Sequence, residues 1–372
     1  MKGSLRTFAV SVLLAVALAP PAQASPTLEG NAKPVTHFGL LRVRDLTPFG
    51  FLRLDMRPAH AVSGPPGAWG VELELGYQNT WVLSPNVEQY LTSLPGRRRL
   101  GPNEIQAIRD LPGEAYLVDL ELALLDATYH YKLTRNWGVY AVLSAVSYNG
   151  GFLDSTVESF HNTFGFSSFG RPAVNRNDIN VILDLKKTQL IQPELPDGGL
   201  LDPTFGVRYT AAPYSAPWNM VVEAAVKIPI DGARPFLSTG NADFGAQVTL
   251  QRFLRRHAGY ASLAAVYTQG SDIAPATYSP QVVPTLILGY EYKLSARTNL
   301  IAQTYASRSV FSRDDTDLEG LLKTKYQISA GVRYRFGTSV LSFALTENLG
   351  SFNNTPDVGF QIGWAYSPLF MH

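Results

Sequence analysis

The chain has 372 residues, with 31 basic and 30 acidic side chains and no cysteine. The near-zero net charge gives no reason to expect a nucleic-acid partner, and the missing thiols exclude disulfides, zinc–thiolate sites and cysteine nucleophiles. Aromatic residues are frequent, with 19 Phe, 18 Tyr and 5 Trp. A secreted enzyme, a periplasmic binding protein and an outer-membrane barrel all fit this composition, so the periodicity of the sequence must decide among them.

Residues 1–24 have the pattern of a secretory signal peptide. Lys2 and Arg6 precede the apolar run "FAVSVLLAVALA", and Ala22 and Ala24 occupy the −3 and −1 positions of a cleavage site before Ser25. The apolar run is shorter than the ~20 residues that a membrane-spanning helix needs, so an N-terminal anchor is the weaker interpretation. Cleavage would leave one more acidic side chain than basic ones.

After the signal, apolar and polar residues alternate in one segment after another. In "KTKYQISAGVRYRF", Tyr326, Ile328 and Tyr334 fall on one face, and Lys325 and Arg333 fall on the other. Successive side chains of a strand point to opposite faces, so the pattern predicts a strand with one apolar face. Similar segments begin at positions 71, 204, 244, 286 and 358.

The strand lengths and connections favour a membrane barrel over a soluble sandwich. The candidates run for ~10 to 15 residues, whereas strands of globular proteins average ~5 to 6. Short connections near 133, 213, 255, 295 and 337 alternate with long ones at 83–114, 150–202, 229–241, 270–281 and 310–322. This layout predicts an all-β fold, a transmembrane antiparallel up-and-down β-barrel of about 12 strands at 68–367, surrounded by the lipids of the bacterial outer membrane.

The second predicted strand, "VDLELALLDATYHY", changes its apolar phase part-way. Val118 and Leu122 share one phase, whereas Leu125 and Ala127 follow the other. A β-bulge near Leu124 would restore a single outward face, because a bulge inserts one extra residue on one strand.

Residues 25–67 precede the first counted strand. "TPFGFLRLDMRP", residues 47–58, also alternates, but one further strand alone would break the even strand number of such barrels. Either "FGLLRV", residues 38–43, pairs with it and the barrel has fourteen strands, or residues 25–67 form an N-terminal arm or plug.

Charged residues on the polar strand faces are predicted to point into the lumen. They are Glu72, Glu74, Asp119, Glu121, Arg208, Lys323, Lys325, Arg333 and Arg335. Acids gather in the first two strands and bases near the end of the chain, and barrel closure brings the two groups near each other. Two interpretations stay open: a transverse field across a water-filled pore, or salt bridges that fill a narrow lumen.

The stretch "GGFLDSTVESFHNTFGF", residues 150–166, has a helical period instead of a strand period. Leu153, Val157, Phe160 and Phe164 form an apolar stripe on this short helix. The helix lies in the longest external loop, 150–202, and a structureless loop of that length is uncommon in a compact domain. We therefore expect the loop to fold over or into the barrel mouth as a lid or constriction.

Asp154, Glu158 and His161 form a polar stripe beside the apolar one. A metal site is disfavoured because only one histidine is present, and no metal or other cofactor is predicted. A hydrolytic site would use His161 as base and Asp154 to orient it. The candidate nucleophiles are Ser155, Ser159 and Asn162. Two residues of separation does not let Ser159 and His161 face each other on one helix. A structural lid with salt bridges to Arg171 or Arg176 is the favoured interpretation.

Several motifs resemble a known family. "GGFLDSTVESFHNTFGFSSFGRP", "VKIPIDG" at 226–232 and "RVRDLTPF" near the start are similar to a family of proteobacterial proteins catalogued as a domain of unknown function. The resemblance covers most of the mature chain. It implies a Gram-negative envelope protein and carries over no catalytic or binding residue.

The leading functional hypothesis is a passive channel for small solutes across the outer membrane. The alternatives are a barrel-embedded lipid or lipopolysaccharide hydrolase using His161, and a structural barrel with a filled lumen. A transporter of hydrophobic substrates would require fourteen strands. The last strand resembles the insertion signal read by the barrel-assembly machinery, which is therefore an expected partner; the matching residues are Asp357, Gly359, Ile362 and Trp364.

Overall fold

The computed structural model describes residues 37–47, 49–59, 64–211, 217–348, 354, 355 and 357–366. The chain divides into two compact units, residues 1–33 and 34–372, and every described residue belongs to the second unit. The predicted signal peptide lies outside the described residues, as do residues 25–36 of the predicted N-terminal arm.

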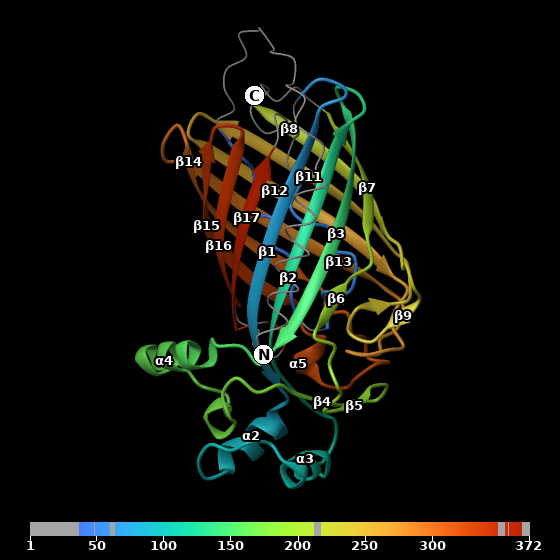
Figure 1. The fold of residues 1–372 in the computed structure, drawn as a ribbon, viewed down its shortest axis with the longest axis vertical. Coiled ribbons are helices and arrows are strands. Elements are labelled where there is room, and N and C mark those ends of the chain that lie inside the picture. The colour runs from blue at the N-terminus through green and yellow to red at the C-terminus, as the bar shows by residue number, and fades with distance from the viewer. Residues whose placement is uncertain are drawn as a thin grey trace. The chain divides into compact units, whose positions relative to one another are not determined.

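Twelve long strands form a closed antiparallel barrel (Figure 1). Each strand pairs with the next around the barrel, and the last pairs with the first in a register that sets Val71 opposite Tyr366. The strands are β1 (Trp69–Leu83), β2 (Ala115–Lys132), β3 (Trp137–Asn149), β7 (Thr204–Thr210), β8 (Trp218–Lys227), β11 (Asp243–Leu254), β12 (His257–Thr268), β13 (Gln281–Lys293), β14 (Thr298–Ser307), β15 (Lys325–Phe336), β16 (Ser339–Asn348) and β17 (Val358–Tyr366). The predicted barrel and its twelve strands are confirmed, and the alternative of fourteen strands is wrong.

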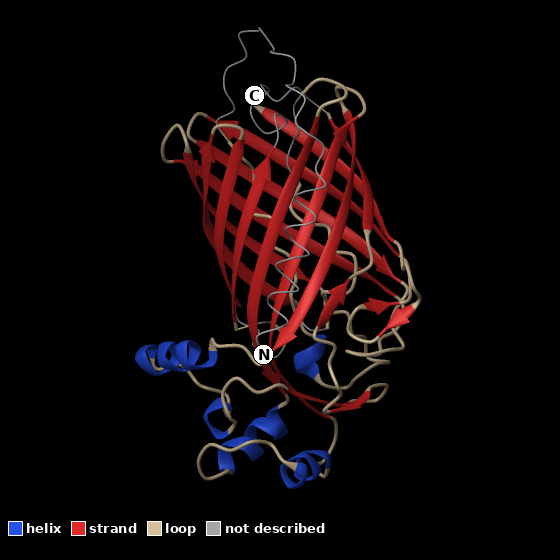
Figure 2. Cartoon of the chain, in the orientation of Figure 1, coloured by secondary structure: helices blue, strands red, loops and turns tan. Residues whose placement is uncertain are grey.

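Short connections join the strands at one end of the barrel, the turn end, and long connections join them at the other, the loop end. The helices gather at the loop end (Figure 2) and are α2 (Pro85–Ser93), α3 (Pro102–Arg109), α4 (Asp154–Phe164), η1 (Arg171–Ala173) and α5 (Glu319–Leu322). The short strands β4 (Asn180–Asp184), β5 (Gln189–Ile191) and β6 (Gly198–Leu200) extend the sheet, and β9 (Ala233–Arg234) pairs with β10 (Ser238–Thr239). In the described part of the chain, no helix has the length and apolarity to cross a membrane.

The barrel presents apolar side chains outward and polar side chains inward. In β13, Leu286 and Leu288 are 42% and 47% exposed, whereas the inward-facing Thr285 and Glu291 of the same strand are buried. A water-soluble sandwich would bury its apolar rows between two sheets. Here they form the outer surface, which is the arrangement that lipid requires.

Strand β2 contains no bulge, contrary to the prediction. It pairs in unbroken register with β1 from Trp69 opposite Tyr131 to Leu83 opposite Leu117, and its pairing with β3 is unbroken as well. The apolar phase changes because the surroundings of the two faces change. Near the loop end, Leu122 points inward into an apolar cluster, and nearer the turn end Tyr129 points outward and is exposed.

Two apolar clusters flank the β1–β2 hairpin at the loop end. The inner cluster joins Leu120 and Leu122 to Phe49, Phe311 and residues of the other long loops. The outer cluster joins Leu117 of β2 to α2 and α3, and its members include Val87, Leu91, Ile108 and Ile182. The hairpin thus extends beyond the barrel wall and carries a helical cap on its outer face.

Candidate functional site: the barrel interior

Residues 37–47 and 49–59 run inside the barrel, and we call them the interior segment. They form neither helix nor strand, which is why the barrel has twelve strands and not fourteen. Every residue of the segment is buried except Arg44 and Asp55, which are half-buried. Its path follows from hydrogen bonds to inward-facing side chains of strands all around the barrel.

The segment begins at the turn end. His37 lies within 3.1 Å of the carbonyl oxygen of Arg255, in the turn between β11 and β12. The backbone amides of Phe38 and Gly39 donate to the Glu291 carboxylate of β13, at 2.7 and 3.1 Å. Two amides aimed at one buried carboxylate fix the backbone with charge-assisted hydrogen bonds.

Farther along, three arginines of the interior segment meet acids of β1 and β2. Arg42 lies 3.2 Å from Glu72, and Arg44 and Arg57 each lie 3.1 Å from a different oxygen of Asp126. The two arms of the segment therefore share one carboxylate. Burial makes each of these charges costly unless it is paired, so the pairs are mutually dependent.

The segment reverses direction at the loop end. Asp45 accepts hydrogen bonds from Lys325 of β15 and from Arg53, which is 3.3 Å away in the returning arm. Phe49 and Phe51 at the reversal pack into the inner apolar cluster, with Phe49 edge-on to Phe311. The tip is thus held by both a buried ionic contact and apolar packing.

The returning arm runs back to the turn end along β8 and β11. The Leu54 amide donates to Asp243 at 2.8 Å, and Lys227 donates to the Leu52 carbonyl oxygen at 2.8 Å. The last described residue of the segment, Ala59, accepts from Gln251 near the same turn that His37 contacts. The interior segment therefore enters and leaves by the turn end.

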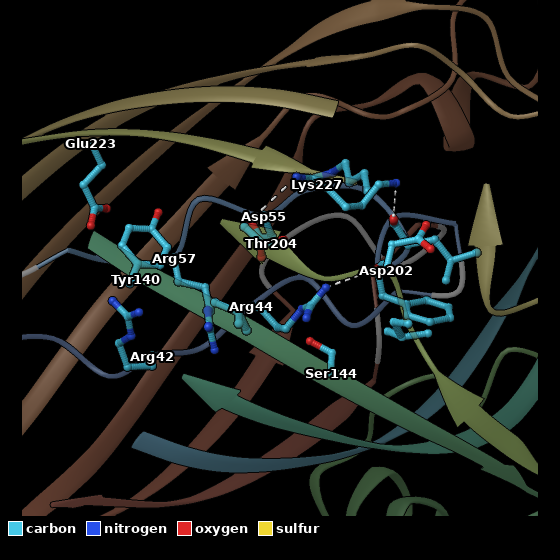
Figure 3. A pocket seen from close by; sticks show the side chains of 15 residues that line it. Arg42, Arg44, Asp55, Arg57, Tyr140, Ser144, Asp202, Thr204, Glu223 and Lys227 are labelled. Atoms are coloured by element: carbon cyan, nitrogen blue, oxygen red, sulfur yellow. Dashed lines mark hydrogen bonds and ion pairs between the residues drawn. The ribbon is translucent and has the colours of Figure 1, made fainter. Parts of the chain in front are cut away.

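Little free volume remains beside the segment. A cavity of about 40 Å³ lies between the segment and the wall formed by β3 and β8. Figure 3 shows Arg42, Arg57, Tyr140 and Glu223 around it. This volume holds about three water molecules, which is too little for a solute to pass. Beside this cavity the interior segment fills the lumen.

Five of the predicted lumen charges do face the interior. Glu72 and Lys325 bind the interior segment directly, and Arg333 donates to the carbonyl oxygens of Phe38 and Leu40. The other two are Glu74, which accepts from Gln361 at 2.9 Å, and Arg208, which pairs with Glu223. These charges are bonded to neighbouring protein groups, so they do not form two opposed walls across open water.

The other four predicted lumen charges lie elsewhere. Asp119 and Glu121 point outward from β2, because the unbroken register with β1 places odd-numbered residues on the outer face. Lys323 is exposed and precedes β15, and Arg335 is half-buried at the turn end, near the Ala296 carbonyl oxygen.

The main cations of the lumen were not among the charges predicted from the sequence to face it. Arg42, Arg44, Arg53 and Arg57 come from the interior segment and supply the ion pairs with the barrel wall and within the segment. A signal for them exists in "LRVRDLTPFGFLRLDMRP", where four arginines gather in a short stretch of a chain of balanced charge. Buried arginines need carboxylates nearby, and β1 and β2 provide Glu72 and Asp126.

The predicted polar stripe of α4 lies outside the lumen. Asp154 accepts from Arg171 at 2.6 Å, from Asn79 at 3.0 Å and from the Asn177 amide at 2.7 Å. Glu158 accepts from Arg97 at 2.7 Å and from Arg176 at 2.9 Å. Both acids anchor the helix to the outer face of the β1–β2 hairpin and its cap.

The pKa values of two acids outside the membrane-spanning strands, Glu158 and Asp357, are shifted by these contacts and by burial. Burial alone would raise the pKa of Glu158, but hydrogen bonds from Arg176 and Arg97 outweigh burial and hold the pKa below its ordinary value. Asp357, which binds Arg171, behaves in the opposite way: burial dominates and raises its pKa despite that arginine.

Two of the predicted hydrolytic residues make other contacts. The Ser159 hydroxyl donates to the Ser155 carbonyl oxygen at 2.7 Å, along the helix and not toward His161. Asp154, the predicted orienting acid, is occupied by Arg171. Over the described residues, no group of three or more histidines and acids has the geometry to hold a metal ion.

The predicted lid residues are split between two roles. Val157 is buried against the barrel extension, but Phe160 and Phe164 are 46% and 62% exposed and do not cover the mouth. Leu153, half-buried, precedes the helix. Instead, a later part of the same loop packs against the tip of the interior segment; its contributing residues are Ile179, Val181, Leu183, Leu185, Leu190, Leu195 and Leu201.

The sequence model of one family, described as "Protein of unknown function (DUF3187)", matches residues 112–367. The chain belongs to this family. The match spans most of the barrel, whereas the interior segment and β1 precede it. No curated protein matches the sequence.

One solved structure shares the fold, and two others are similar at lower scores. The crystal structure of an outer membrane channel from Pseudomonas putida F1 is 12% identical and has a TM-score of 0.51, covering 84% of this chain and 99% of that one. A FadL homologue from Pseudomonas aeruginosa is 11% identical, with a TM-score of 0.39 and coverage of 88% and 99%. The toluene transporter TbuX from Ralstonia pickettii is 13% identical, with a TM-score of 0.40 and coverage of 82% and 90%.

The exposed side chains of this DUF3187 protein indicate that it lies in a membrane. Exposed apolar side chains cover the outside of a barrel whose strands leave no open edge, and exposed Tyr131, Trp137 and Trp218 lie near the turn end. A β-sheet can span hydrocarbon only when it is closed, and aromatic side chains favour the interface of a bilayer. The protein is a β-barrel of the bacterial outer membrane.

Proposed function

We propose that this protein is a passive channel for small solutes, closed at rest by the interior segment, which acts as a plug. The single observation that carries the proposal is the path of residues 37–59. Because both arms enter from the turn end, the segment can leave the lumen without threading through the barrel or breaking a strand pairing. A barrel filled only by its own wall side chains would have no such removable part.

The chemistry of the contacts supports a plug that can move. The segment is held by ion pairs and hydrogen bonds, such as Arg42 with Glu72 and Arg44 with Asp126, and by apolar packing of residues such as Phe49 and Leu54. After displacement, water can solvate both partners of each pair, so the wall that remains would be a polar lumen suited to hydrated solutes. The shared fold with the Pseudomonas putida channel is compatible with this role.

Planar-bilayer recordings test the proposal. We expect the full chain to conduct little, and a variant lacking residues 37–59 to give a steady conductance in potassium chloride. A synthetic peptide of residues 37–59, added to the turn side, should block that conductance, and a scrambled peptide should not. If the deletion variant folds, as judged by heat-modifiable mobility in electrophoresis, and still does not conduct, the channel proposal is wrong.

A structural barrel with a filled lumen is the second candidate. The observation that favours it is the small size, about 40 Å³, of a cavity beside a segment that is buried except at Arg44 and Asp55. Under this alternative the full chain would show no openings at any applied voltage, because the segment never leaves the lumen, whereas a channel closed by a movable plug would show brief openings. The same recordings therefore separate the two candidates. In either case the pattern of the last strand supports recognition by the barrel-assembly machinery during insertion.

A further inference from the structure

Four phenylalanines form an exposed aromatic surface at the loop end. Phe152, Phe160, Phe164 and Phe166 are 59%, 46%, 62% and 57% exposed. The rings of Phe160 and Phe164 have centroids 4.7 Å apart, and those of Phe160 and Phe166 are 5.9 Å apart. A cluster of this kind on a protein surface marks a contact with another apolar phase, because it costs free energy in water.

The local backbone is built to hold this cluster together. Helix α4 ends at Gly165, whose φ of 73° lies in the left-handed region that terminates helices. The next amide, that of Phe166, donates to the His161 carbonyl oxygen at 2.9 Å and turns the chain back. The Phe166 ring is thereby set beside the rings of α4, so the exposed position of these side chains follows from the helix cap.

Helix α4 has three distinct sides. Asp154 and Glu158 face the barrel extension and are fixed by Arg171, Arg97 and Arg176. At 100° per residue, Phe160 and Phe164 lie on one flank of that ionic side. The exposed residues Ser155, Ser159 and Asn162 lie on the opposite flank, and the exposed Thr156 and Thr163 lie between the two flanks. A helix with opposed apolar and polar flanks is the form that lies in a membrane interface.

The aromatic surface is continuous with the outer wall of the barrel. Phe152 stacks on Tyr77 of β1 with ring centroids 5.2 Å apart, and Tyr77 stacks on Phe360 of β17 at 5.3 Å. Tyr77 and Phe360 belong to the outward-facing rows of paired strands. Figure 1 shows α4 projecting sideways from the barrel at the loop end, where an outer leaflet would meet the wall.

Cationic side chains accompany the cluster. Three arginine side chains near α4 are partly exposed: Arg97 by 30%, Arg98 by 33% and Arg176 by 47%. Arg97 and Arg176 also anchor the helix through Glu158. Exposed arginines next to an apolar flank match a surface with acyl chains below and phosphate groups above.

We propose that α4 and the four phenylalanines on and beside it, which together we call the foot, lie on the outer leaflet of the membrane. The apolar flank of the foot contacts lipid, and its polar flank contacts water. The occupant is the lipid surface itself. The buried ionic contacts of Asp154 and Glu158 hold the foot at a fixed height against the barrel.

Site-directed spin labelling tests this placement on the full chain. Because the protein has no cysteine, single substitutions Phe164→Cys and Ser159→Cys can each carry a nitroxide without background labelling. The labelled protein is reconstituted in vesicles of phosphatidylethanolamine and phosphatidylglycerol. Power saturation then compares collisions with oxygen, which concentrates in lipid, and with a nickel chelate, which stays in water.

We expect the oxygen-to-nickel collision ratio to be several-fold higher at position 164 than at position 159. Phe160→Cys, on the same flank as position 164, should repeat the high ratio, which guards against an effect of one substitution. Equal nickel access at positions 164 and 159 would show that the flank lies in water. Access by neither reagent at 164 would show that protein covers it, for example a second copy of the chain. Either result overturns the proposal.

Discussion

Lys325 and Asp45 form a buried ionic contact inside the barrel although 280 residues separate them in the chain. Lys325 is the first residue of β15, and Asp45 belongs to the interior segment just before its reversal. The contact therefore joins the wall to the plug at the loop end, farthest from the end by which the segment enters.

Removal of the Lys325 charge should loosen the plug. Lys325→Met leaves Asp45 with one cation, Arg53, and breaking a buried ion pair typically costs about 3 to 5 kcal/mol. We expect a higher open probability in planar bilayers than for the unaltered chain. The double variant Asp45→Asn with Lys325→Met removes both charges and should close the channel again in part. An open probability that stays unchanged in the single variant would contradict the role of this contact.

Asp126 should matter more to the plug than another inward carboxylate of similar burial. It binds Arg44 of the entering arm and Arg57 of the returning arm, so Asp126→Asn disturbs both arms at once. We expect faster hydrogen–deuterium exchange at residues 37–59, measured by mass spectrometry. Glu74→Gln is the matched control, because the hydrogen bond of Glu74 goes to Gln361 of β17. Similar exchange in both variants would mean that the shared carboxylate has no special function.

The strands could be predicted from the sequence because each has one apolar face in lipid. The alternation holds where the outer face meets lipid, as in Tyr326, Ile328 and Tyr334 of β15, all more than 40% exposed. It changes phase in β2, whose outer face meets protein at the loop end. The interior segment has the same alternation, but Arg53 and Leu54 are each 2% exposed, so both of its faces are buried. An alternating sequence shows that the two faces of a segment meet different surroundings. It does not show where the segment lies when both faces contact protein.

The candidate site was harder to predict for a related reason. Glu72 and Glu121 look alike in the sequence, since both sit on the polar face of a predicted strand. Glu72 points inward to Arg42, whereas Glu121 points outward and accepts from Asn79 and from the amides of Phe152 and Leu153. The outer face becomes protein-covered at the loop end, so an outward acid there is satisfied by the long loop and not by the lumen.

The anchoring of α4 should depend on pH through Glu158. Its folded-state pKa lies below the ordinary value, which is near 4.5, so the contact contributes stability above that value and loses it as the pH falls through the lowered pKa. We expect a spin label at position 159 to become more mobile between neutral pH and about pH 3. In Glu158→Gln the label should already be mobile at neutral pH and should change little. An equal pH response in both proteins would assign the effect to another group.

Gly151 should be intolerant of a side chain because two constraints meet there. Its φ of 78° is in the left-handed region, and a Cβ would lie 1.7 Å from the Glu121 side chain, whose carboxylate holds the following two amides. Gly151→Ala must therefore displace Glu121 and loosen the start of α4, which we expect to lower stability by more than the ~1 kcal/mol of backbone strain alone. Gly232→Ala is the control, because Gly232 also has a positive φ, 63°, but no heavy atom lies within 4 Å of its Cβ position. Thermal unfolding of the two variants in detergent, followed by circular dichroism, makes the comparison. If Gly151→Ala lowers the midpoint no more than Gly232→Ala does, the crowding around Glu121 does not stabilise the loop.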